Sequence, residues 1–481
     1  MYFKIKIFLF IYTILNAVNI NASENDEHII CYFNSQAAYV RGYGKFDIER
    51  IDPTLCTHVV YMSAGIDRNG FVTSLDPDLD LPEGRDFYGQ VNALKKDHPH
   101  LKTLLSIDVD TIIARNRTQW LIGSSIRFLG DYGFDGLNLN WGESTSDSFF
   151  EYLTRLKVNY DAYGLLLYTS VNSKNLVGYD VATFCRNFHI VGLKTFDLHG
   201  PWKNITGHHS PLHAANGEDA VDSTLEYFLK QGCPANKVVI GLSSFGRTYT
   251  LVDEDLYKVG APSAGLGHSG METEIPGFVS YYEHDYDLFV GRTWRVHFDE
   301  FAEVPYYVDT RRWVSIDSPE SLAKKAQYAL RKQIAGVLFW TLDTDDFRSG
   351  VLTYPLLRAV NEAISAGYTE VTTEEEHTTE EVTENPTTEI PTVTTEIPVP
   401  GELCTSEGFA PHPADCSKFI LCMRNPLGQL VAYELQCPSV QALVQSVWDQ
   451  GSSVCSLPQI DYCSAPTSLQ KFANLIPVKN N

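Results

Sequence analysis

The segment GFDGLNLNWGES, residues 133–144, sets polar side chains at regular spacing along a short apolar run. Side chains two residues apart on a β-strand point to the same side, so Asn138, Asn140 and Gly142 share one face. An amide can hydrogen-bond a ligand but carries no negative charge, and Gly142 has no side chain. This face can therefore bind a polar group, but it offers neither an acid nor a base.

The carboxylate nearest to this face in the sequence is Glu143. A step of one residue turns a strand side chain to the opposite side, so we expect Glu143 to point outward, toward the helices. Only a local bulge would bring it to the ligand side as an acid. The 14 histidines form no spaced cluster with cysteines or carboxylates, so we predict no metal site and no cofactor.

The elements that must position these residues are apolar runs that alternate with amphipathic, helix-like segments. Unbroken apolar runs predict parallel strands buried on both faces. Eight such units favour an α/β fold of the (β/α)₈ (TIM) barrel type over an open sheet. The stretch from about 248 to 307 is too long for a simple connection, and we interpret it as a small inserted subdomain. The eight runs are IICYF, THVVYMSAGI, KTLLSI, GLNLNW, GLLLYTSV, IVGLKTF, VVIGLSSF and GVLFWTL.

The polar segment resembles the fourth-strand signature of family 18 glycoside hydrolases, the chitinases, which reads D-G-x-D-x-D-W-E. Asp135, Gly136 and Trp141 match it, whereas Asn138, Asn140 and Gly142 stand where two aspartates and a glutamate belong. Other segments resemble the family in the same order, so the resemblance covers nearly the whole mature chain. They are CYF, LCTHVVY, KTFDLHGPW, TGHHSPL, SFGRTYTL and FWTLDTDDFRSG.

This resemblance implies a reaction that the chain cannot perform. In the family, the glutamate protonates the glycosidic oxygen while the N-acetyl group of the substrate attacks, steadied by the neighbouring aspartate. We therefore expect no catalytic residue and no enzyme activity. Asn140 could still hydrogen-bond an acetamido group.

The resemblance also implies a weakened sugar-binding barrel. The family motif S-x-G-G-W becomes Ser106–Asp110, the first-strand tryptophan becomes Gln36, Met-x-Tyr-Asp becomes Lys194–Asp197, and a further tyrosine becomes Ile316. Retained aromatic faces could still stack on pyranose rings. The alternative for Tyr32 and Trp340 is that they survive as barrel core. The retained candidates for carbohydrate binding are Tyr32, Trp202, Asp197 and Trp340, of which the last resembles the floor of the central sugar subsite.

Six of the ten cysteines fall within the last part of the chain, in a segment too short to form a stable core without crosslinks. GFAPHPADCSKFILC resembles the peritrophin-type chitin-binding module of arthropod chitinases. The resemblance implies the pairs Cys404–Cys422, Cys416–Cys463 and Cys437–Cys455. Phe419, Tyr433 and Trp448 are the candidate chitin contacts. The alternative is a disulfide knot without chitin affinity.

The start of the chain has the pattern of a secretory signal peptide, with Lys4 and Lys6 before an apolar run that is short for a membrane anchor. We therefore expect a secreted, extracellular protein in which cysteines pair. Among three connectivities of the four early cysteines we favour Cys31–Cys56 and Cys185–Cys233. Asn116 and Asn204 lie in N-glycosylation sequons.

The net charge of −23 argues against a nucleic-acid partner, but ten glutamates between Glu370 and Glu402 supply much of it. That stretch is rich in Thr, Glu and Pro and predicts an extended linker, either O-glycosylated or bare. The expected order is a signal peptide (1–22), the barrel (23–367), the linker (368–402), the chitin-binding module (403–464) and a tail (465–481).

Three functions fit this sequence. The first is a secreted, monomeric protein that binds chitin or chito-oligosaccharides without hydrolysing them, similar to arthropod chitinase-like proteins that include mite allergens. The second is a secreted signalling or growth-factor-like protein that reuses the barrel, and the third is a chitinase working through unusual residues. We favour the first, with chitin binding resting chiefly on the six-cysteine module.

Overall fold

The computed structural model describes residues 27–115, 120–142, 147–172, 180–215, 217–289, 293–348 and 353–367, and the backbone of seven short strands between 408 and 456. The chain divides into two units, Met1–Thr372 and Thr373–Asn481. The predicted signal peptide, linker and tail lie outside the described residues. None of the described helices combines the length and apolar character needed to cross a bilayer.

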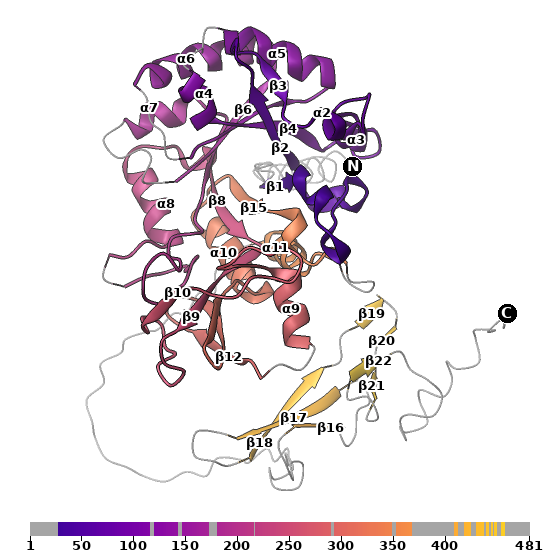
Figure 1. Cartoon of the computed structure of the whole chain (residues 1–481), viewed down its shortest axis with the longest axis vertical. Coiled ribbons are helices and arrows are strands. Elements are labelled where there is room, and N and C mark those ends of the chain that lie inside the picture. Colours follow the sequence, from indigo (N-terminus) through magenta and orange to yellow (C-terminus); the bar gives the residue numbers. More distant parts are fainter. Residues whose placement is uncertain are drawn as a thin grey trace, which may run out of the picture. The chain divides into compact units, whose positions relative to one another are not determined.

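The first unit is built on eight parallel strands that close into a barrel (Figure 1). Strand β1 pairs with β15 on one side and with β2 on the other, so the sheet has no open edge between these strands. The predicted (β/α)₈ barrel is confirmed, and each predicted run supplies one strand. The barrel strands are β1 (His28–Asn34), β2 (His58–Ile66), β4 (Lys102–Asp108), β5 (Gly136–Asn140), β6 (Leu166–Val171), β7 (Ile190–Leu193), β8 (Val238–Ser243) and β15 (Gly336–Trp340).

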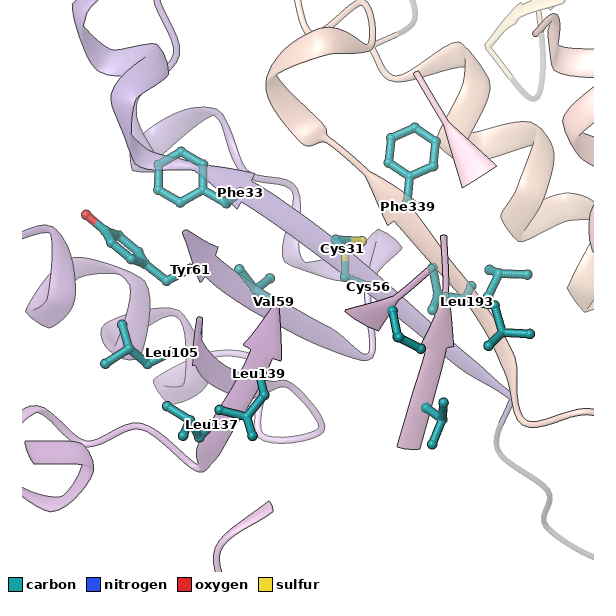
Figure 2. Packing of buried hydrophobic residues seen from close by; sticks show 14 of the residues in the cluster. Cys31, Phe33, Cys56, Val59, Tyr61, Leu105, Leu137, Leu139, Leu193 and Phe339 are labelled. Carbon is teal, nitrogen blue, oxygen red and sulfur yellow. A yellow bond between two sulfur atoms is a disulfide. The ribbon is translucent and has the colours of Figure 1, made fainter. Parts of the chain in front are cut away.

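Alternating side chains of each strand serve two different cores. In β1, Ile30 and Tyr32 pack inside the barrel, whereas Cys31 and Phe33 belong to the larger cluster between strands and helices. Figure 2 shows residues of that larger cluster projecting from several barrel strands. Because both faces are covered by apolar groups, the strands read as unbroken apolar runs.

Helices and short hairpin elements follow the strands. The helices of this unit are α2 (Pro77–Asp80), α3 (Phe87–Ala93), α4 (Val109–Arg115), α5 (Leu121–Tyr132), α6 (Asp147–Ala162), α7 (Val181–Arg186), α8 (Val221–Lys230), α9 (Tyr281–Phe289), α10 (Pro319–Arg331) and α11 (Pro355–Ser365). A short strand, β3 (Val72–Ser74), pairs antiparallel with β2 beyond the barrel.

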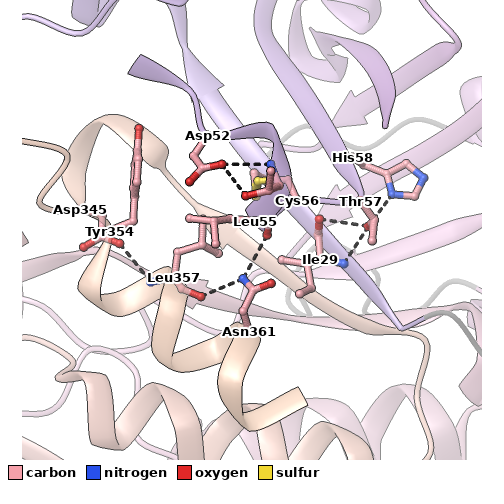
Figure 3. The surroundings of a disulfide bond; sticks show 12 residues. Ile29, Asp52, Leu55, Cys56, Thr57, His58, Asp345, Tyr354, Leu357 and Asn361 are labelled. Atoms are coloured by element: carbon pink, nitrogen blue, oxygen red, sulfur yellow. Dashed lines mark hydrogen bonds between the residues drawn. A yellow bond between two sulfur atoms is a disulfide. The ribbon is translucent and has the colours of Figure 1, made fainter. Parts of the chain in front are cut away.

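Two disulfides crosslink neighbouring strand entrances, in the pairing that the sequence analysis favours. Cys31–Cys56 joins β1 to the start of β2, and Cys185–Cys233 joins α7 to the turn before β8. Beside the first, the Thr57 hydroxyl donates to the Ile29 carbonyl and accepts from its amide (Figure 3). The pairs expected among the last six cysteines lie outside the residues whose side chains are described.

An inserted sheet stands between the seventh and eighth barrel strands. It begins in β9 directly after β8, and β14 pairs back onto β9, so both ends belong to the insertion. It extends at both ends beyond the expected stretch of about 248–307, because only the pairing of β9 with β14 assigns these two strands to the second sheet. The insertion holds α9 and the strands β9 (Phe245–Leu251), β10 (Ser263–Leu266), β11 (Phe278–Ser280), β12 (Arg295–Asp299), β13 (Val304–Asp309) and β14 (Arg312–Ser315).

The second unit contains short antiparallel strands. Their order is β16–β17–β18 in one sheet, with β19–β20 and β21–β22 as two further pairs. Their bounds are β16 (Gly408–Pro411), β17 (Lys418–Arg424), β18 (Leu430–Gln436), β19 (Ser439–Gln441), β20 (Val444–Gln445), β21 (Val447–Asp449) and β22 (Val454–Ser456).

Candidate functional site

A cleft of about 590 Å³ opens where the barrel strands end, which is where (β/α)₈ proteins place their sites. The ends of β1, β2, β4, β5 and β15 form its base, and the inserted sheet contributes one wall. Its lining residues are Asn34, Gln36, Met62, Ser63, Leu75, Asp76, Asp80, Ser106, Asp108, Asn140, Asp197, Phe245, Arg247, Phe278, Trp340, Thr341, Asp343 and Thr344.

Asn138 is fully buried below this cleft and has a partner for each end of its amide. The Tyr32 hydroxyl donates to its Oδ1 at 3.0 Å, and its Nδ2 donates to Ser106 Oγ at 3.1 Å. Burial raises the pKa of Tyr32, so this hydroxyl remains a donor. The neutral amide is therefore satisfied inside the barrel.

Asn140 lies one step higher and lines the cleft. Its Nδ2 donates to Asp108 Oδ1 at 2.6 Å, and it accepts from Ser170 Oγ at 3.0 Å. The Asn140 bonds thus join the three neighbouring strands β4, β5 and β6, whereas the Asn138 bonds join β5 to β4 and, across the barrel, to β1.

Gly142 is packed closely against Asp110, the second residue of α4. A Cβ built on Gly142 would overlap the Asp110 carboxylate. The space in which a side chain at 142 would begin is therefore taken by a carboxylate from the neighbouring βα connection. Sequence reasoning identified both residues as departures from the family but could not place them in contact.

Lys194, which the sequence analysis noted only as a departure from the family motif, lies at the base of this site. Its Nζ donates to the Trp141 carbonyl oxygen at 2.6 Å. The same Nζ lies over the Trp340 ring, 5.6 Å from the ring centroid. One feature of the sequence pointed to this position, a lysine directly after the apolar run of β7.

The charge of Lys194 is set by opposing influences. Burial lowers its pKa to about 8, while Asp108, Asp110 and Asp197 act in the raising direction. Lys194 is thus a cation at neutral pH, under the influence of carboxylates from two strand ends, those of β4 and β7.

Trp340 is partly buried and lines the cleft, whereas Tyr32 is not among the lining residues. The Tyr32 ring lies 4.7 Å from Trp340 and the Phe196 ring 5.7 Å from it, measured between centroids. Tyr32 and Phe196 belong to the inner barrel core. Tyr32 is therefore a residue of the barrel core, and its ring packs against Trp340.

Asp197 lines the cleft and is bound by Arg247, whose Nε and Nη2 donate to its two oxygens at 2.6 and 2.7 Å. Burial alone would raise the pKa of Asp197, but His209 and Arg247 lower it to about 2. Trp202 is 57% exposed, outside the cleft lining, with the Arg247 guanidinium 5.6 Å from its ring centroid. Arg247 was missed because SFGRTYTL was matched as a segment without a role for its arginine.

The other residues singled out from the sequence differ in exposure and in whether they line the cleft. Gln36 is exposed and lines the cleft, Ile316 is buried in the inserted unit, and Asn204 is exposed. Asn116 and Glu143 lie outside the described residues. Phe419, Tyr433 and Trp448 fall on β17, β18 and β21, whose side chains are not described. Within the described ranges, no group of three or more His, Cys, Asp and Glu side chains could hold a metal ion.

The contact at Gly142 can be tested by adding one methyl group. We expect Gly142→Ala to destabilise the protein by about 0.5–1.5 kcal/mol, because the methyl overlaps the Asp110 carboxylate and forces that side chain toward another rotamer. In an Asp110→Ala background the cost should largely disappear. The measurement is a double-mutant cycle by urea unfolding. Gly123→Ala in α5, where a Cβ meets nothing within 4 Å, is the matched control and should be neutral or stabilising. An equal cost in both backgrounds would contradict the contact.

Lys194 should also affect how stability depends on pH. Its folded-state pKa of about 8 is below the ordinary lysine value of 10.5, so the unfolded chain binds more protons between these values. Stability should therefore rise with pH across this window, by roughly 1–3 kcal/mol. Comparing Lys194→Met with the parent protein by denaturant unfolding at several pH values isolates this contribution. A constant difference between the two proteins would show that the ammonium is not desolvated.

The chain is similar to curated chitinases. It is 33% identical over 393 residues to Probable chitinase 2 of Drosophila melanogaster, covering 70% of this chain and 81% of the relative.

Solved structures have the same fold. The Ostrinia furnacalis Group IV chitinase in complex with allosamidin matches with a TM-score of 0.67 and 35% identity, over 71% of this chain and 100% of that one. Human YKL-39, described as a pseudo-chitinase with retained chitooligosaccharide binding properties, matches with a TM-score of 0.65 and 29% identity, over 70% of this chain and 100% of that one.

The family model for glycosyl hydrolases family 18 matches residues 28–345, the whole span from the first barrel strand to the segment after the last. The fold, the cleft at the strand ends and these similarities agree: this chain belongs to glycosyl hydrolases family 18.

Proposed function

We propose that this protein is an exported, chitinase-like protein that binds chitin and does not hydrolyse it. The observation that carries the proposal is the set Asn138, Asn140 and Gly142, which puts two amides and a glycine where the resemblance calls for three carboxylates. General acid catalysis is worth about 10² to 10⁴ in rate, so the missing glutamate alone would leave little activity. The missing aspartate removes the group that would steady the intermediate.

The surroundings of these positions support the proposal. Asn138 already exchanges hydrogen bonds with Tyr32 and Ser106, and Asn140 with Asp108 and Ser170. Each amide has hydrogen-bond partners, so neutral side chains are accommodated at both positions without an unsatisfied polar group. Neutral, hydrogen-bonded side chains at these positions can contact a ligand without acting on it as an acid or a base.

The barrel keeps part of a sugar-binding surface. Trp340, Phe245 and Phe278 line the cleft beside the amide of Asn140. Aromatic faces and a few polar groups are the usual composition of a carbohydrate cleft. The description of YKL-39 shows that a family member called a pseudo-chitinase can retain chitooligosaccharide binding.

The C-terminal segment supports attachment to polymeric chitin. Its HPADCSKF core and the order of its six cysteines resemble a peritrophin-type module. A small module tethered by a long linker raises the local concentration of the barrel on the polymer. On this proposal the tail provides most of the retention on chitin.

One observation favours a second candidate, a chitinase with a displaced acid. Asp110 holds its carboxylate in the space beside Gly142, near the position from which the family glutamate would extend. Asn140 cannot supply the negative charge that the neighbouring aspartate gives in the family. A relocated acid without that charge would act alone, so binding without turnover is the better-supported function.

Turnover of a fluorogenic chitotrioside across acid to alkaline pH separates the two candidates. We expect no release of fluorophore above the uncatalysed background, because both the acid and the assisting carboxylate are absent. Asp110→Asn is the decisive variant, with Asp131→Asn on the exposed face of α5 as its control. Turnover that is lost in Asp110→Asn and kept in Asp131→Asn would establish a relocated acid and refute the proposal.

Retention on insoluble chitin tests the binding function. We expect the full-length protein to be retained, Trp448→Ala to lose most of that retention, and Trp340→Ala to lose little. Trp120→Ala, which alters a 51% exposed tryptophan outside the cleft lining, is the matched control. A full-length protein that is recovered entirely in the unbound fraction would end the chitin-binding hypothesis.

A further inference from the structure

We propose that Lys194 is the specificity-determining residue of the barrel cleft, and that its ammonium disfavours a neutral N-acetylated pyranose on the Trp340 ring. This inference rests on the proposed function, since it concerns the same cleft and the same class of ligand. It identifies what sets the affinity of the barrel for chito-oligosaccharides, as distinct from that of the tail.

The first step is the position of the ammonium. Lys194 Nζ lies over the Trp340 ring, 5.6 Å from its centroid, and is fixed there by a 2.6 Å hydrogen bond to the Trp141 carbonyl oxygen. Tyr32 and Phe196, both buried in the inner core, pack against the same ring at 4.7 and 5.7 Å. The ring is thus packed against the barrel core and approached by a cation from the end of β7, two strands away from β15.

The second step is the effect of that cation on the ring. Lys194 is partly buried and is not among the residues that line the cleft, so a sugar on Trp340 would meet its charge through the ring. A cation over an aromatic ring and a sugar stacked on that ring draw on the same electron-rich π-system. The ammonium and the pyranose therefore compete for one aromatic ring.

The third step is why the lysine remains in place. Asp108, Asp110 and Asp197 all favour its charged form, and they come from β4, from α4 and from the loop after β7. Asp110 also fills the space beside Gly142. Asp110 therefore links the lysine to position 142, and the lysine stays cationic at neutral pH.

The test is a calorimetric titration of the full-length protein with N,N′,N″,N‴-tetraacetylchitotetraose. Lys194→Met keeps the length of the side chain and removes its charge, and we expect the affinity to rise about tenfold, a typical cation–π effect. Lys194→Arg keeps the charge and should show no gain. In a Trp340→Ala background the gain from Lys194→Met should vanish, because the surface it frees is no longer there.

A second neutral variant keeps the experiment decisive. Lys194→Gln can still donate to the Trp141 carbonyl, so it retains the anchoring hydrogen bond without a charge and should also bind more tightly. If Lys194→Met fails to fold, as judged by thermal unfolding, Lys194→Gln gives the answer. An unchanged or weaker affinity in the folded neutral variants, or an equal gain without Trp340, would overturn the role of Lys194.

Failure of this inference is distinguishable from failure of the proposed function. A protein that is retained on chitin, but whose neutral Lys194 variants gain no affinity for the tetrasaccharide, refutes the role of Lys194 alone. A protein that neither adheres to chitin nor binds the tetrasaccharide in any variant refutes both.

Discussion

Closure of the barrel by β1 is the constraint on which the rest of the first unit depends. This strand pairs with β15, more than 300 residues away, and with β2, and the Cys31–Cys56 disulfide fixes its lower end beside β2. Parallel strands that meet in a ring must all end on the same rim. Closure therefore sets Trp340 beside Tyr32 and brings Asn140 and Asp108 to one cleft, with Lys194 against the Trp340 ring.

The strand ends show how neutral amides can be held in order inside the barrel. A buried aspartate needs compensating hydrogen bonds or cations, and removing one partner of such a network leaves a costly unsatisfied group. The amides of Asn138 and Asn140 avoid this, since each has both a donor and an acceptor partner within reach. The remaining charges, Lys194 with its aspartates and Arg247 with Asp197, balance one another at the rim.

Much of the barrel could be predicted from the sequence, because each strand is a short apolar run and local patterns report burial directly. The bounds of the insertion could not, since β9 follows β8 directly in the sequence and only its pairing with β14 assigns both strands to the second sheet. For the site, the spacing of Asn138, Asn140 and Gly142 was informative because residues two apart share a face. The contacts of Lys194 with Trp340 and of Gly142 with Asp110 join separate strand ends, and no local pattern encodes them.

The close packing of Gly142 against Asp110 also bears on the history of the chain. A glutamate at 142 would place its side chain against the Asp110 carboxylate. The Asp110 side chain would have to rotate away, or residue 110 would have to change as well. The two positions are thus coupled in evolution, because the side chains tolerated at 142 depend on the residue at 110.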